Sequence, residues 1–175
     1  MEKPLEKAAD IQLIVFDVDG VLTSGSLIMG ETGEACKIFH VHDGMGFVML
    51  REAGIDIAII SARTSQIVSE RMVALGVKHV YQGEDNKRET ITKLMRKLKL
   101  KKEQVAYVGD DLIDLPAMRA CGFSVAVNNA HPLVKEHADW TTNKGGGQGA
   151  AREVCELVLH AQGKLHDLHQ RYLGD

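Results

Sequence analysis

Apolar residues in this chain occur in short, nearly unbroken runs that are separated by longer mixed stretches. The runs are too short for helices and too apolar for strands that face water on one side. Strands buried on both faces, as in a parallel sheet, carry this pattern. At least five such runs are present, at residues 11–16, 55–60, 77–80, 104–108 and 123–127.

Helical periodicity is clear between these runs, at residues 65–75, 87–98 and 150–162. Strands that alternate with helices imply right-handed crossovers and a doubly wound α/β sandwich. In such a fold, ligands bind beyond the carboxyl ends of the strands. The residues that directly follow each apolar run are therefore the first candidates for a functional site.

Three glycines mark the expected ends of helices. Gly54, Gly76 and Gly122 each follow a helix-like stretch and precede an apolar run. Glycine at this place commonly adopts the left-handed conformation that closes a helix. We therefore expect a left-handed turn at all three positions.

Residues 21–41 interrupt the alternation and predict a β-hairpin. Two extended arms flank residues 30–33 (Gly-Glu-Thr-Gly), whose composition suits a tight turn. Apolar side chains of residues 27–29 and 36–39 would face both sides of a ribbon that projects from the domain. Such a ribbon would expose an apolar patch in a monomer, so we expect the hairpins of several copies to pack together. The alternative is that the hairpin folds back onto its own core.

The last part of the chain, residues 143–175, is expected to form a glycine-rich C-terminal tail. Its glycine run at 145–149 is expected to be a flexible linker that leads into the helix at 150–162. From Gly163 onward the chain is polar and contains histidines, and we expect part of it to be disordered. Residues 1–175 are thus predicted to form one domain that carries a hairpin and a C-terminal tail.

Composition and charge narrow the class of protein. The 175 residues are 45% hydrophobic and 26% charged, as in an ordinary globular domain. A net charge of -3 gives no reason to expect nucleic acid or an anionic membrane as partner. The N-terminus is too charged for a signal peptide, and the three cysteines are expected to be buried, unpaired thiols in a reducing compartment. These features predict a cytoplasmic protein.

Charged and hydroxyl side chains stand directly after the apolar runs. Because parallel strands end at the same edge of a sheet, these side chains are expected to lie close together. Clustered carboxylates repel unless a cation compensates them, and a donor set of oxygens alone favours magnesium over zinc. A single Asp after a strand more often caps a helix, as Asp111 or Asp114 would. The expected cluster comprises Asp17, Asp19, Ser61, Arg63, Lys87, Asp110, Asp111 and Asp114.

The order of these residues resembles the four motifs of the haloacid dehalogenase-like superfamily. The counterparts are residues 17–23 (D-V-D-G-V-L-T), Ser61, Lys87 and residues 109–116 (G-D-D-L-I-D-L-P). The resemblance implies a Rossmann-like fold of the haloacid dehalogenase type and a magnesium-dependent phosphatase. A dehalogenase needs neither an acid two residues after its nucleophile nor a metal, so the motifs argue against that activity.

The resemblance also implies a role for each motif residue. Asp17 would attack phosphorus and form an aspartyl-phosphate, while Asp19 would give a proton to the leaving oxygen and later take one from water. Magnesium would be held by Asp17, the main-chain carbonyl of Asp19, and Asp110, with Asp111 or Asp114 assisting through water. Ser61 and Lys87 would bind the phosphoryl group through a hydroxyl hydrogen bond and a positive charge.

The spacing of the motifs leaves no room for the cap domain that closes the site in many members of this superfamily. Either the substrate is large, or another subunit closes the site. The chain resembles the capless 3-deoxy-D-manno-octulosonate 8-phosphate phosphatase family over roughly residues 10–163. Besides the motifs and the hairpin, this resemblance rests on residues 39–47 (F-H-V-H-D-G-M-G-F), 125–132 (V-A-V-N-N-A-H-P) and 145–155 (G-G-G-Q-G-A-A-R-E-V-C).

This second resemblance implies a homotetramer in which the glycine-rich tail of one subunit reaches over a neighbour's site. It also implies a small sugar acid phosphate from lipopolysaccharide precursor biosynthesis as substrate, with phosphate at one end and carboxylate at the other. Arg63 would bind the carboxylate through its planar guanidinium group, and Arg152 would contribute through the tail.

Three alternatives remain open at this point. The first is a phosphatase for a nine-carbon sugar acid 9-phosphate, although that branch tends to carry an acidic residue near the position of Arg63. The second is a capless phosphatase that acts on a protein or a nucleic acid. The excess of acidic over basic residues disfavours nucleic acid as the substrate. The third is a non-catalytic binding module, which predicts the loss of at least one motif residue, and none is lost here.

Overall fold

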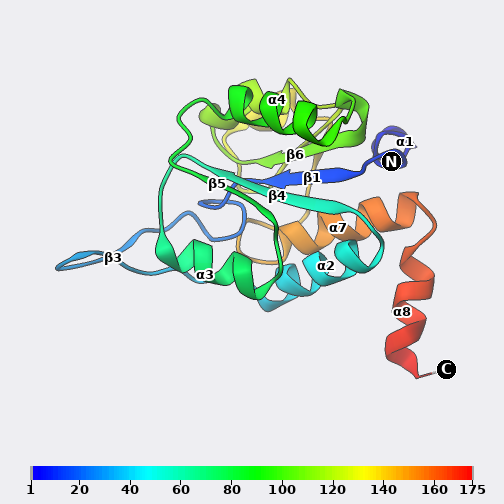
Figure 1. Cartoon of the computed structure of the whole chain (residues 1–175), viewed down its shortest axis with the longest axis horizontal. Coiled ribbons are helices and arrows are strands. Elements are labelled where there is room, and N and C mark those ends of the chain that lie inside the picture. The colour runs from blue at the N-terminus through cyan, green and yellow to red at the C-terminus, as the bar shows by residue number, and fades with distance from the viewer. Residues whose placement is uncertain (1, 175) are drawn as a thin grey trace.

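Six parallel strands form the central sheet of the protein (Figure 1). The structure is a computed structural model that describes residues 2–174. The strand order is β5-β4-β1-β6-β7-β8, and every neighbouring pair is parallel, which confirms the predicted doubly wound α/β fold. The strands are β1 (Leu13–Phe16), β4 (Asp56–Ser61), β5 (His79–Gln82), β6 (Val105–Gly109), β7 (Phe123–Ala126) and β8 (Trp140–Thr141).

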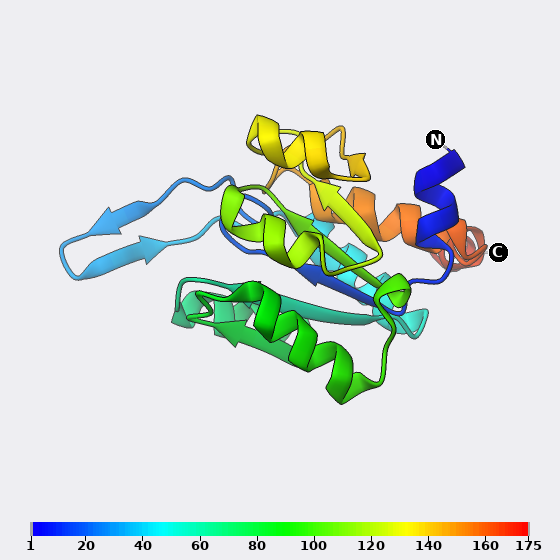
Figure 2. The same cartoon turned by 90° about the horizontal axis from the view of Figure 1, so that it is seen from above.

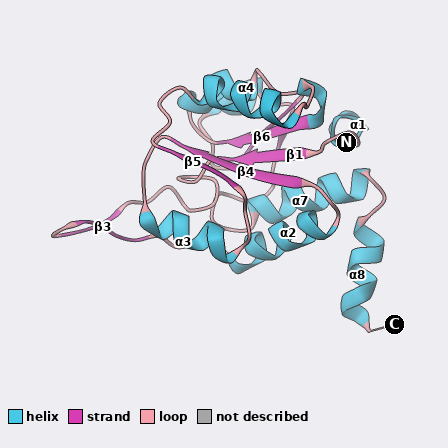
Figure 3. Ribbon diagram, viewed as in Figure 1, coloured by secondary structure: helices cyan, strands magenta, loops and turns pink. Residues whose placement is uncertain are grey.

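Helices cover both faces of this sheet (Figures 1 and 3). Helix α4 lies on one face and packs against α5, whereas α2, α3 and α7 lie on the other. Helices α2 and α7 run side by side, and α1 packs against α7. The helices are α1 (Glu2–Ala8), α2 (Val41–Glu52), α3 (Gln66–Ala74), α4 (Lys87–Leu98), α5 (Leu115–Met118), α6 (Pro132–His137), α7 (Ala150–Ala161) and α8 (Leu165–Leu173).

Burial along the strands follows their place in the sheet. Every residue of the central strands β1 and β6 is buried, because helices cover them on both faces. The edge strand β5 is only half-buried along its length. The unbroken apolar runs of the sequence are therefore the signature of the interior strands.

Two of the three glycines behave as expected. Gly54 and Gly76 adopt φ angles of 76° and 68°, in the left-handed region. The prediction for Gly122 was wrong, because its backbone is not left-handed. A side chain there would place Cβ 2.5 Å from the Cα atom of Glu103, and the Gly122 amide donates to the Lys102 carbonyl oxygen at 2.6 Å. Close approach of two backbones, rather than a turn, requires glycine at this position.

The hairpin projects from the body of the protein, as predicted (Figure 2). Its strands are β2 (Ile28–Gly30) and β3 (Gly33–Cys36), which pair around the expected turn, but they are shorter than the predicted arms. Met29 and Ile38 are 61% and 68% exposed, so the hairpin does not fold back onto its own core. Cys36 is exposed too, contrary to the expectation that all cysteines are buried.

The glycine run at 145–149 is packed against the rest of the chain, so the expected flexible linker is not found. The amide of Gly147 donates to the Val21 carbonyl oxygen at 3.0 Å. A Cβ atom on Gly146 would lie 1.7 Å from the carbonyl oxygen of Gly20. The glycine run therefore packs directly against the loop that follows β1.

The C-terminal segment after Gly163 is helical, where we expected partial disorder. Helix α8 leads away from the body of the protein, and Leu168 is its one buried residue (Figure 1). Apolar contact through this side chain and packing against α7 give the polar segment a fixed place that its composition did not indicate.

Candidate active site

All of the residues expected at the strand ends except the fully buried Asp114 line one cavity. It has a volume of about 250 Å³ and lies beyond the carboxyl ends of β1, β4 and β6. This is the edge at which open parallel sheets bind ligands. Its lining residues are Asp17, Asp19, Gly25, Leu27, Ser61, Ala62, Arg63, Lys87, Asp110, Asp111 and Ile113.

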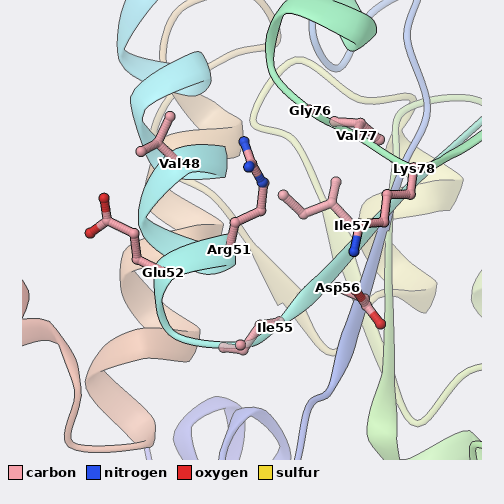
Figure 4. A pocket seen from close by; sticks show the side chains of 10 residues that line it. Val48, Arg51, Glu52, Ile55, Asp56, Ile57, Gly76, Val77 and Lys78 are labelled. Carbon is pink, nitrogen blue, oxygen red and sulfur yellow. The ribbon is translucent and has the colours of Figure 1, made fainter.

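A larger pocket of about 430 Å³ lies at the opposite, amino end of β4 (Figure 4). Arg51, Glu52, Asp56 and Lys78 place two positive and two negative charges around it. Arg51 already donates to the Leu75 carbonyl oxygen at 2.7 Å. None of the residues expected from the motifs lines this pocket, so the smaller cavity is the candidate active site.

Lys87 lies between two buried carboxylates. Its Nζ atom is 2.9 Å from Oδ1 of Asp17 and 2.7 Å from Oδ1 of Asp114. Burial alone would lower the pKa of Lys87, but the charges of Asp114 and Asp17 outweigh it and raise this pKa above its ordinary value. Lys87, the first residue of α4, therefore places a positive charge beside Asp17.

Asp114 is fully buried and serves as an anchor for this corner of the site. Besides Lys87, it accepts hydrogen bonds from the Tyr107 hydroxyl at 3.0 Å and from the amide of Asp110 at 3.1 Å. Asp111 instead caps the short turn that follows, accepting from the Leu112 amide at 2.8 Å. Asp114 completes this cap by accepting from the Asp111 amide at 3.3 Å, so both residues take part in the predicted capping.

The acidic cluster fits a divalent cation. Oxygen atoms of Asp17, Asp110 and Asp114 all lie within 4.8 Å of one another. Oδ1 of Asp110 is buried and has no hydrogen-bond partner among residues 2–174. Burial, followed by the charge of Asp114, raises the pKa of both Asp17 and Asp110 to about 7. A cation with oxygen ligands would compensate this crowded charge, and such a ligand set suits magnesium.

Glycine at position 20 makes room for the Asp110 carboxylate. A Cβ atom there would lie 2.0 Å from Oδ2 of Asp110. The same loop is held by hydrogen bonds from the amides of Leu22 and Thr23 to the Val18 carbonyl oxygen, at 2.9 and 3.1 Å. These contacts keep the residues after β1 in a tight turn whose carboxylates face the cavity.

Ser61 and Arg63 border the cavity from the end of β4. Ser61 is buried, and its Oγ atom accepts a hydrogen bond from the Arg63 amide at 3.3 Å, which leaves its hydroxyl proton free to donate. The Arg63 side chain is 46% exposed, and its guanidinium lies 3.7 Å from Oδ2 of Asp19 and 3.8 Å from Oε1 of Glu34. It thus keeps donors available toward the mouth of the cavity.

Two charged residues of the hairpin, Glu34 and Lys37, also reach the site, and neither was predicted from the sequence. Nζ of Lys37 lies 2.5 Å from Oδ1 of Asp19 and 2.7 Å from Oε1 of Glu34. The available signal was a lysine inside the otherwise apolar stretch of residues 36–39. Burying such a charge requires a partner of opposite sign, but the pattern does not say which residue that partner is.

Arg152 does not line the cavity of its own chain, in contrast to the catalytic and metal-binding residues that the motifs predicted. It lies on α7, where its Nε atom pairs with Oε1 of Glu156 at 2.8 Å. Its Cδ atom packs close to Gly46 of α2. Arg152 therefore does not border the candidate active site within its own chain.

Comparison with known proteins identifies close relatives. The haloacid dehalogenase-like hydrolase family matches residues 73–153. The 3-deoxy-D-manno-octulosonate 8-phosphate phosphatase of Salmonella typhi is 48% identical over 163 residues, which span 93% of this chain and 87% of that protein. No helix among residues 2–174 is long and apolar enough to cross a membrane.

Solved structures extend this likeness to the fold. The Moraxella catarrhalis phosphatase of the same name, in complex with magnesium, phosphate and the sugar acid KDO, superposes with a TM-score of 0.96 at 40% identity, over 98% of this chain and 99% of that one. The cobalt-bound Haemophilus influenzae phosphatase superposes with a TM-score of 0.91 at 43% identity, over 95% and 99% of the two chains.

Proposed function

The chain belongs to the 3-deoxy-D-manno-octulosonate 8-phosphate phosphatase family of haloacid dehalogenase-like hydrolases, and on that premise we propose how its residues perform the reaction. The enzyme hydrolyses 3-deoxy-D-manno-octulosonate 8-phosphate to the free sugar acid and phosphate, a step of lipopolysaccharide precursor synthesis. The observation that carries this function is the cluster of Asp17, Lys87 and Asp110 around one cavity at the strand ends. The relatives are named for the eight-carbon substrate, so the nine-carbon alternative is not favoured.

In the first step, a carboxylate oxygen of Asp17 attacks phosphorus and the ester bond to the sugar oxygen breaks. Lys87 stays beside Asp17 and offers its charge to the oxygens of the transferring group. The Ser61 hydroxyl donates a hydrogen bond to another of these oxygens. Asp19 gives a proton to the departing sugar oxygen, which leaves as an alcohol.

In the second step, water attacks the phosphorus of the aspartyl-phosphate. Asp19 takes a proton from this water, the bond from phosphorus to Asp17 breaks, and phosphate is released. Asp17 and Asp19 thereby return to their starting states. Each half of the reaction uses the same pair of carboxylates, which explains why they stand two residues apart at one strand end.

Magnesium is the cofactor that this donor set suits. Asp17, the main-chain carbonyl of Asp19, and Asp110 would hold it. When bound, it neutralises charge on the carboxylate and the phosphoryl group, and so lets two anions approach each other. The orphaned oxygen of Asp110 and the raised pKa of Asp17 support this assignment.

Two arginines, Arg63 and Arg152, would bind the sugar acid. Arg63 stands at the mouth of the cavity with a half-exposed guanidinium, and its planar fork suits a carboxylate. Arg152 would act from a neighbouring subunit, since it lies away from the cavity of its own chain. The exposed apolar hairpin supports a homotetramer, and the single six-stranded central sheet supports one domain over residues 1–175. A cytoplasmic location stays a prediction.

The proposed function predicts a clear order of activities. With magnesium, the eight-carbon sugar acid 8-phosphate should be hydrolysed faster than a nine-carbon sugar acid 9-phosphate, and chelation should abolish both activities. Asp17→Asn should lower kcat on the order of 10⁴-fold, because it removes the nucleophile. Phosphate release measured across a panel of phosphorylated sugars tests this. Faster turnover of the nine-carbon ester, or full activity of Asp17→Asn, would contradict the proposal.

A further inference from the structure

Lys37 is a buried ammonium at the base of the hairpin. Its side chain is 3% exposed and touches two carboxylates, Asp19 at 2.5 Å and Glu34 at 2.7 Å. Burial alone would lower the pKa of Lys37, but hydrogen bonds to Asp19 and Glu34 outweigh burial and raise it. A lysine in such surroundings stays charged and holds its partners in place.

Glu34 ties this lysine to the sheet. The hydroxyl of Ser65, in the loop after β4, donates a hydrogen bond to Oε2 of Glu34 at 2.8 Å. The amide of Ser65 in turn donates to the side chain of Gln82 on β5, also at 2.8 Å. The hairpin projects into solvent at its tip, but its base is therefore fixed to two strand ends. The position of Lys37 is set by the rigid part of the protein.

Lys37 leaves one oxygen of Asp19 free. Oδ1 of Asp19 is bound by Lys37, while Oδ2 lies 3.7 Å from Nε of Arg63, beyond hydrogen-bond distance. A general acid must lie within hydrogen-bond reach of the atom that it protonates, and its side chain must point there. Without a cation beside it, the Asp19 carboxylate would be free to turn away from the acidic cluster around Asp17 and Asp110.

We propose that Lys37 is the positioning residue for proton transfer by Asp19, an inference that rests on the proposed function. Lys37 holds Oδ1, so the proton exchanged with substrate is carried on Oδ2. As the bond from Asp17 to phosphorus forms and the ester bond breaks, this proton goes to the departing alcohol oxygen. When water later attacks phosphorus, Oδ2 takes one proton back. The hairpin thereby supplies part of the catalytic geometry within its own chain.

The test compares two kinds of leaving group in Lys37→Met. Departure of an alkoxide from a sugar phosphate depends on a proton from Asp19, whereas 4-nitrophenolate leaves from 4-nitrophenyl phosphate with little help. The ratio kcat/KM reports steps up to departure of the leaving group and not the later attack of water. We expect this ratio to fall about 100-fold for the sugar phosphate and less than about 5-fold for the aryl ester. The inhibition constant of inorganic phosphate should change less than about two-fold.

Matched variants separate positioning from a structural role. Lys37→Arg keeps the charge and should restore most of the lost sugar phosphate activity. Lys93→Met removes an exposed lysine on α4 and should leave both substrates unaffected. An equal loss on both substrates, or no loss on either, would overturn the proposal. If Lys37→Met does not fold, Lys37→Gln takes its place under the same two criteria.

Failure of the proposed function is distinguishable from failure of this inference. A wild-type enzyme that does not hydrolyse the eight-carbon sugar acid phosphate contradicts the function alone. The comparison of leaving groups can then be made with ribose 5-phosphate or any other alkyl phosphate that the wild type accepts. A selective loss of alkyl over aryl ester hydrolysis still supports the role of Lys37, and a uniform loss contradicts it.

Discussion

At the residue scale, the carboxylates of the site divide into two groups by their partners. Asp114 is fully engaged by Lys87, Tyr107 and main-chain amides, so it acts as an internal anchor. Asp17 is buried and Asp110 half-buried, Oδ1 of Asp110 has no hydrogen-bond partner among residues 2–174, and the pKa of each is raised to about 7. Spare buried oxygens next to one another are what a cation requires.

The raised pKa values predict a pH-dependent magnesium affinity. Magnesium binds the ionised carboxylates, so protons compete with it below about pH 7 and are released when it binds. Between pH 8 and pH 6 the affinity should fall by about 10- to 100-fold, depending on whether one or both carboxylates are protonated. Titration of the protein with magnesium by calorimetry, in two buffers of different ionisation enthalpy, measures both the affinity and the proton release.

The variant Asp110→Asn is the control for that experiment. It removes one titrating ligand, so it should bind magnesium more weakly and with a shallower dependence on pH. An affinity that stays constant from pH 6 to pH 8 in the wild-type protein would show that these carboxylates are already ionised, and would contradict the argument from burial.

At the element scale, helix α7 depends on a cap that comes from another helix. Its N-cap residue is Gly149, which has no side chain to accept the first amides of the helix. Asp43 of α2 accepts from the Arg152 amide at 2.8 Å instead. Asp43 is buried and 109 positions away in the chain, so this contact ties the two neighbouring helices together.

Loss of this cap should lower stability. Asp43→Ala should reduce the free energy of unfolding by about 1–2 kcal/mol, because it leaves amides at the start of α7 without an acceptor. Asp43→Asn keeps an acceptor oxygen and should lose less. Urea unfolding measures both, with Asp10→Ala as a control at an exposed position. Equal stability of Asp43→Ala and the wild type would mean that water replaces the cap at no cost.

At the scale of the whole molecule, the projecting hairpin is the feature that a single copy does not explain. Leu27, Ile28, Met29 and Ile38 are all exposed on it, next to a site that has no cap domain. Such a patch usually marks a contact with another protein. Contacts of Lys37 and Glu34 fix the base of the hairpin, so the hairpin would present this apolar patch in a constant direction.

Charges on the hairpin should therefore change the oligomeric state. The double variant Met29→Glu, Ile38→Glu should convert a tetramer of 19.2 kDa chains into smaller species, since burying two added carboxylates is costly. Light scattering after size-exclusion chromatography gives the mass directly. Leu133→Glu, which adds a charge at an exposed apolar position on α6, should leave the mass unchanged. A wild-type protein that is already monomeric would contradict the predicted assembly.

The sequence alone determined the sheet and most of the site. Strands buried on both faces need unbroken apolar runs, and alternation with helices allows few topologies. The same topology brings the carboxyl ends of β1, β4 and β6 together, so Asp17, Ser61 and Asp110 could be grouped before any contact was known. This inference works because it uses only local patterns and the direction of the strands.

Only the tertiary structure decided which distant residues meet. Three contacts illustrate this. Lys37 pairs with Asp19, Asp43 caps α7, and Gly146 approaches the loop after β1. In each case the local sequence pattern of the two segments gives no sign that they meet. Local periodicity reports that a side chain is buried or exposed, but not which atoms surround it. A buried charge states the need for a partner, and only the packed chain supplies that partner.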